Sequence, residues 1–67
     1  MIQIEPQTPL SRWVQSWADS ERLYLWLERT GMFLDDGIPL HEAERRAFKI
    51  VFPHVHLPER FRTALTN

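Results

Sequence analysis

The sequence predicts a small all-α domain of three to four helices, preceded by a short extended N-terminal arm, on three observations. Apolar residues recur at helical spacing in residues 10–17 and again in residues 40–51. Residues that commonly begin helices, namely threonine, serine, aspartate and proline, stand immediately before the helical stretches. Only residues 1–7 alternate apolar and polar side chains as a strand does. We therefore expect one domain over residues 1–67, with a helical core over 8–67.

The arm has no obvious partner in its own chain. Ile2 and Ile4 alternate with polar residues, and Pro6 limits the segment. Because no other segment has the pattern of a strand, we expect the arm either to lie over the helices or to pair with a second copy.

The first helix is predicted to begin at Thr8-Pro9, with Thr8 as the N-cap and Pro9 at the first helical position. Its apolar stripe does not continue past residue 17, because Ser20 and Glu21 occupy the next positions of that stripe. We therefore expect a break or kink near residues 18–20. The stripe consists of Leu10, Trp13, Val14 and Trp17.

A second helix is predicted over residues 20–30, capped by Asp19 or Ser20 and followed by Gly31. It contains five consecutive large apolar residues, 23–27, which at about 100° per residue cannot all face one side.

Within this helix, Leu23, Trp26 and Leu27 share one face, whereas Leu25 points to the opposite side. A helix that is apolar on more than one side is either central in the fold or shared with a partner. The helical neighbours of Leu25 are all charged, namely Glu21, Arg22, Glu28 and Arg29.

The remaining chain predicts a turn at residues 35–37, a third helix from Ile38-Pro39 to before Pro53, and a short last helix that begins at Pro58. Glu44 falls inside the apolar arc of the third helix and does not fit it. The expected core residues here are Ala43, Ala47, Phe48, Ile50 and Val51, and in the last helix Phe61, Ala64 and Leu65.

Composition indicates an ordinary soluble, cytoplasmic domain without a membrane span. The chain has 67 residues and no cysteine, and a chain of this length buries only about 60% of its unfolded surface. Its stability is therefore expected to be marginal unless a second subunit or a partner supports it. The longest strictly apolar run is five residues, far from the roughly 20 that a transmembrane helix needs.

No residue pattern points to catalysis, a metal or a cofactor, so we expect a protein that is not an enzyme. His54 and His56 flank one residue, but a zinc site needs a third or fourth ligand. The serines have no adjacent histidine, and Gly31 and Gly37 form no phosphate-binding loop.

Charge is divided unevenly along the chain. Residues 1–44 carry three basic and eight acidic side chains, whereas residues 45–67 carry five basic and one acidic. A basic C-terminal face favours an acidic partner, and nucleic acid is the alternative reading. The mildly acidic net charge and the absence of glycine from residues 53–57 weaken that alternative. The face consists of Arg45, Arg46, Lys49, Arg60 and Arg62.

Three tryptophans in a domain of this size exceed what one small core readily covers, and aromatic residues with arginine are typical of protein interfaces. We therefore expect a small protein-binding regulator, either an inhibitor or an adaptor, that also associates with itself as a homodimer. No motif identifies the partner or the direction of regulation. The predicted contact residues are Leu25, Trp13, Trp17, Arg22 and Arg29.

Overall fold

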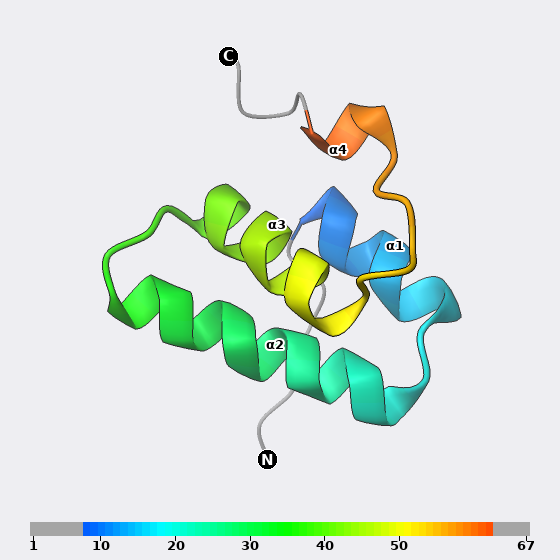
Figure 1. The fold of residues 1–67 in the computed structure, drawn as a ribbon, viewed down its shortest axis with the longest axis horizontal. Coiled ribbons are helices and arrows are strands. Elements are labelled where there is room, and N and C mark those ends of the chain that lie inside the picture. Colours follow the sequence, from blue (N-terminus) through cyan, green and yellow to red (C-terminus); the bar gives the residue numbers. More distant parts are fainter. Residues whose placement is uncertain (1–7, 63–67) are drawn as a thin grey trace.

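A computed structural model describes residues 8–62 of the chain, and these residues form four helices without a strand. The all-α prediction is therefore confirmed, whereas the expected arm and the core positions Ala64 and Leu65 lie outside the described residues. Helices α2 and α3 lie side by side, and α1 packs behind α3. The short α4 lies next to α1, on the side of α3 that faces away from α2 (Figure 1). The helices are α1 (Pro9–Trp17), α2 (Ser20–Asp35), α3 (Leu40–Val51) and α4 (Glu59–Arg62).

Helix α1 begins where the sequence predicts. The Thr8 hydroxyl accepts a hydrogen bond from the Ser11 backbone N–H at 3.0 Å, and the Ser11 hydroxyl accepts one from the Thr8 N–H at 3.1 Å. This reciprocal pair is a capping box that satisfies two otherwise unpaired donors. The predicted break is also present, because α1 ends at Trp17 and Asp19 caps the start of α2.

Helix α2 does not end at residue 30, before Gly31, as predicted, but runs on to Asp35. The helix is terminated by Gly37, two residues past its last residue, whose φ of 89° is accessible to glycine at little cost. There the Gly37 N–H donates to the Leu34 carbonyl at 2.9 Å and the Ile38 N–H to the Phe33 carbonyl at 3.1 Å. This is a Schellman motif, with Ile38 and Phe33 at the two positions that commonly make its apolar contact.

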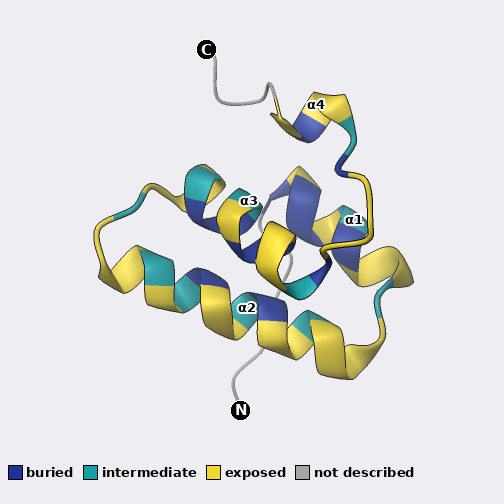
Figure 2. Ribbon diagram, viewed as in Figure 1, coloured by how far each residue is buried: buried dark blue, intermediate teal, exposed yellow. Residues whose placement is uncertain are grey.

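The core lies between α1, α2 and α3 and is closed by the segment that leads into α4 (Figure 2). Trp26 and Val14 are fully buried at its centre, while Leu23 and Leu27 pack against it from the side. The predicted inward face of α2 is therefore present, and Leu25 is exposed on the opposite side. The central cluster of buried apolar residues consists of Leu10, Val14, Trp26, Ala47, Phe48, Phe52, Leu57 and Phe61.

Glu44 joins three helices at one point. The Trp26 indole N–H donates to the Glu44 backbone carbonyl at 3.0 Å, and the Thr8 hydroxyl donates to Glu44 Oε2 at 2.7 Å. The residue is only 4% exposed, and its Oε1 accepts no hydrogen bond within residues 8–62. The misfit that the sequence shows at this position is therefore a buried carboxyl that connects the cap of α1 to α3.

The tryptophans of α1 pack against the end of α3 and against α4. Trp17 meets Phe52 with ring centroids 5.0 Å apart, and Trp13 meets Phe61 at 5.4 Å. Such contacts add to the area that each ring buries. Trp13 and Trp17 therefore make aromatic contacts within the domain, although Trp17 remains 39% exposed.

Two expectations for α3 are wrong. Ile50, placed in the core by its helical angle, is 50% exposed because it lies at the edge of the apolar arc and α2 covers the middle. Arg45, expected on the basic partner-binding face, is half-buried, and its Nη1 donates to the Arg62 carbonyl at 3.3 Å.

The path of α2 through Gly31 predicts opposite effects of alanine at the two glycines. No atom lies within 4 Å of a Cβ built at either position, so backbone conformation alone decides. Gly31→Ala should raise the free energy of unfolding by about 0.5–1 kcal/mol. Gly37→Ala should lower it, because its φ is positive. Urea denaturation followed by tryptophan fluorescence measures both, and destabilisation by Gly31→Ala would show that the helix ends there.

Burial raises the pKa of the Glu44 carboxyl above its ordinary value of 4.5, against the opposing effects of the Thr8 hydrogen bond and of His41. The folded state therefore favours the protonated form of this carboxyl. The resulting contribution to the free energy of unfolding is fully present below pH 4.5 and is lost as pH rises through the raised pKa, because the carboxyl then ionises while buried.

We expect the stability of Glu44→Gln relative to the native chain to increase across that window, by about 1.4 kcal/mol for each unit by which the pKa is raised. Urea denaturation of both proteins between pH 4 and pH 8 measures the difference. A difference that does not change with pH would contradict a raised pKa.

Candidate functional site

Two grooves flank α3, and each contains part of the surface that the sequence singled out. The first, of about 640 Å³, lies between α2 and the end of α3. The second, of about 800 Å³, lies between α3 and the segment that leads through residues 53–58 into α4. The first groove is lined by Glu21, Arg22, Leu25, Glu28, Arg29 and Met32 of α2 and by Ile50 and Val51 of α3.

The floor of the first groove, which we call the α2–α3 groove, is apolar and open to solvent. Leu25 is 48% exposed, Met32 54% and Ile50 50%. Leu25 and Met32 lie seven residues apart, which places them two turns apart on one face of α2. Apolar side chains exposed together in a concave site, rather than singly, are typical of an interaction surface.

Charged side chains surround this floor in an alternating arrangement. Glu21 and Arg22 lie one turn before Leu25, and Glu28 and Arg29 one turn after it. Within residues 8–62, none of these four makes an ion pair with another described residue. The Arg22 guanidinium instead donates to the Val51 backbone carbonyl at 3.2 Å, which ties α2 to the end of α3.

Of the five predicted contact residues, the structure brings Arg22, Leu25 and Arg29 together in this groove. Trp13 and Trp17 do not line it, because they pack into the aromatic cluster with Phe52 and Phe61.

Sequence reasoning missed two of the groove's apolar residues. Met32 could have been found, because it follows Leu25 at helical spacing once α2 is known to pass Gly31. Ile50 had no local signal, since its exposure depends on how α2 lies across α3.

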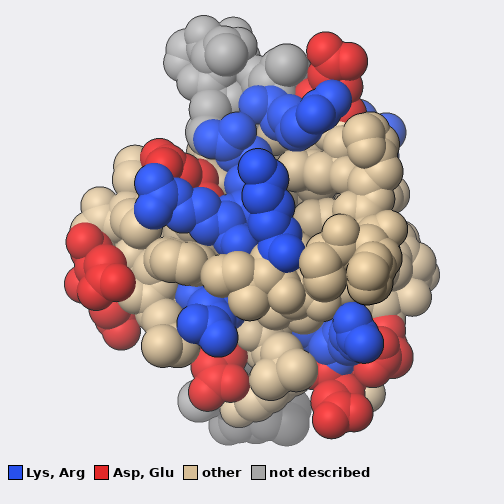
Figure 3. Space-filling view, in the orientation of Figure 1, with Lys and Arg blue, Asp and Glu red and all other residues tan. Residues whose placement is uncertain are grey.

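The second groove, which we call the basic groove, brings together four of the five residues of the predicted charged face. Lys and Arg side chains gather over α3 and α4, with acidic groups at the margin of this face (Figure 3). The exposed His54 and His56 line the same hollow, and Phe48, Phe52 and Leu57 form its apolar floor. The four basic residues are Arg45, Arg46, Lys49 and Arg62.

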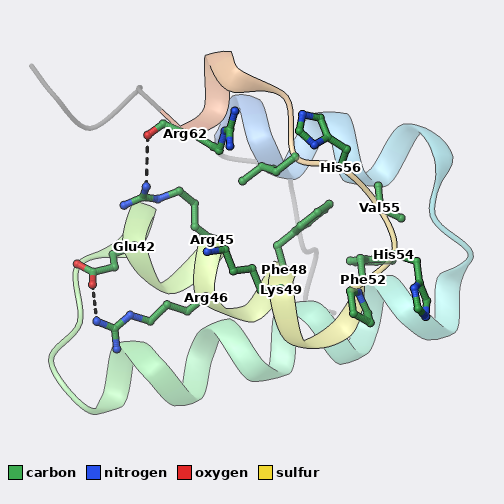
Figure 4. A pocket seen from close by; sticks show the side chains of 12 residues that line it. Glu42, Arg45, Arg46, Phe48, Lys49, Phe52, His54, Val55, His56 and Arg62 are labelled. Carbon is green, nitrogen blue, oxygen red and sulfur yellow. Dashed lines mark hydrogen bonds and ion pairs between the residues drawn. The ribbon is translucent and has the colours of Figure 1, made fainter.

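These cations are not equally available. Arg46 turns aside to an ion pair with Glu42, and Arg45 points toward α4, where it donates to the Arg62 carbonyl (Figure 4). Lys49 is exposed at the centre and pairs with no carboxylate of residues 8–62. Arg60, the fifth predicted residue, lies outside the groove and stacks 4.5 Å from the Phe61 ring.

The part of the chain that the structure describes contains no group of three or more metal-binding side chains, and none of its helices is long and apolar enough to cross a membrane. Compared with known proteins, the chain matches no family model, no curated protein and no solved structure.

Proposed function

We propose that this chain is a small protein-binding regulator, an inhibitor or adaptor without catalytic activity that acts in the cytoplasm. The α2–α3 groove is its binding site, and the ligand is an amphipathic helix. The observation that supports this most is the exposure of Leu25, Met32 and Ile50 in one groove with a charged rim.

The groove has the features by which helices are recognised. A helix offers apolar side chains at i, i+3, i+4 and i+7, and these enter an apolar groove while its charged positions meet the rim. A central apolar anchor that is shielded by a polar rim contributes most of the binding energy at such interfaces. In this proposal Leu25 is the central apolar anchor, and Arg22 and Arg29 belong to the polar rim around it.

The proposal predicts a specific requirement for Leu25. Peptides selected from a displayed library of amphipathic helices should bind the native chain and lose about tenfold or more in affinity with Leu25→Ala. Tyr24→Ala is the matched control, since Tyr24 is 63% exposed on the same helix but does not line the groove. Fluorescence anisotropy measures the affinities.

Both variants should unfold within about 0.5 kcal/mol of the native chain, because neither side chain is in the core. A selection that yields no binder, or binders equally sensitive to Tyr24→Ala, would overturn the proposal.

Nucleic acid is the second candidate, and the basic groove favours it. Arginine and lysine side chains from two helices line this hollow, and such side chains bind phosphates by releasing condensed counterions. Against this, one carboxylate, Glu42, also lines it and already pairs with Arg46.

If the basic groove binds phosphates, duplex DNA of random sequence should shift in a gel at low salt, and the shift should weaken steeply as salt rises. Lys49→Glu combined with Arg46→Glu should abolish it, whereas Arg12→Glu, on α1 and outside both grooves, should weaken it much less. An absent shift at about 50 mM salt would exclude this candidate.

A further inference from the structure

The rim of the α2–α3 groove is complementary to itself. Counted from Leu25, Glu21 lies four residues before and Arg29 four residues after, while Arg22 lies three before and Glu28 three after. Each acidic position therefore has a basic position at the same distance on the other side. Reversing the direction of the helix about Leu25 exchanges every charge for its opposite.

We propose that the occupant of this groove is a second copy of the chain. Its α2 lies antiparallel to the first across a twofold axis beside Leu25. This inference rests on the proposed function, since it names the helix that the groove takes. In an antiparallel pair, positions equidistant from the axis face each other, as in any isologous contact. Glu21 then faces Arg29 of the second copy, and Arg22 faces Glu28 of the second copy.

Symmetry doubles these contacts, so four oppositely charged pairs surround the two Leu25 side chains. A parallel arrangement would place each residue opposite itself and bring like charges together, which is unfavourable. Exposed ion pairs contribute little affinity individually. In this interface the apolar floor supplies the affinity, and the charges determine the direction and register of the two helices.

Ion pairs within α2 do not account for this charge pattern. Glu21, Glu28 and Arg29 have no oppositely charged residue three or four positions away, which is where pairs stabilise an isolated helix. Within residues 8–62 they also make no ion pair across the fold. The arrangement that satisfies all of them at once is the reversed copy of α2.

The antiparallel pairing predicts that two variants, each of which self-associates weakly alone, will associate with each other when they are mixed. In Arg22→Glu, two pairs of carboxylates face each other in the homodimer, and in Glu28→Arg, two pairs of guanidinium groups do. When the variants are mixed, the new carboxylate at position 22 of one chain meets the new guanidinium at position 28 of the other. The other three pairs are native, namely Arg22 of the second chain with Glu28 of the first and the two Glu21–Arg29 pairs, so all four pairs are again complementary.

Sedimentation velocity at about 10–200 μM measures the self-association of the native chain, of each variant and of the equimolar mixture. We expect each variant alone to associate about tenfold or more weakly than the native chain. The mixture should recover association close to the native value. The double variant Arg22→Glu/Glu28→Arg should also recover it, because the swap restores complementarity within one chain. Circular dichroism and thermal melts verify that every variant is folded, which matters most for Arg22→Glu because it also removes the exposed hydrogen bond to the Val51 carbonyl.

The outcomes separate this inference from the proposed function. If the native chain associates and Leu25→Ala weakens the association, but the mixture does not recover it, the antiparallel register is wrong while the groove remains a protein-binding site. A native chain that stays monomeric at 200 μM overturns the self-pairing. The selection of helical peptides then decides independently whether the groove binds another protein.

Discussion

The hydrogen bond from the Trp26 indole to the Glu44 carbonyl is the constraint on which the rest of the structure depends. It fixes the rotation of α2 about its own axis, because a fully buried indole leaves no room to turn. Leu23 and Leu27 flank Trp26 on the core side, and Leu25 lies about 200° around the helix from each of them, so it faces away from the core. The Thr8 hydroxyl reaches the same residue, and the start of α1 is therefore placed by the same junction.

Helix α3 is the element that the two grooves share. Its buried face holds the core, and the side chains at the edges of that face line a hollow on either side. Ile50 contributes to the apolar α2–α3 groove, and the adjacent Lys49 to the basic groove. The two sides of α3 therefore differ in chemistry, with an apolar floor and a mixed charged rim on one side and a cluster of basic side chains on the other.

Local signals predicted much of this fold, and long-range contacts account for the errors. The cap at Thr8 and the break before Ser20 were correct because each depends on neighbouring residues alone. The end of α2 was wrong because two glycines compete, and Gly37 prevails through the Schellman motif. The burial of Glu44 and the exposure of Ile50 depend on α1 and α2 lying across α3. Three of five contact residues fell in one groove because helical spacing alone places them around Leu25.

The central claim is that the outward face of α2, whose direction Trp26 determines, is covered in solution by the α2 of a second copy of the chain. Methyl NMR spectra of the native chain at about 20 μM and at about 1 mM test it most directly. The account predicts that the signals of Leu25, Met32 and Ile50 shift with concentration, while those of the buried Val14 and of Val55, which lines the basic groove, do not. Spectra that are unchanged with concentration, or shifts centred on Val55, would contradict it.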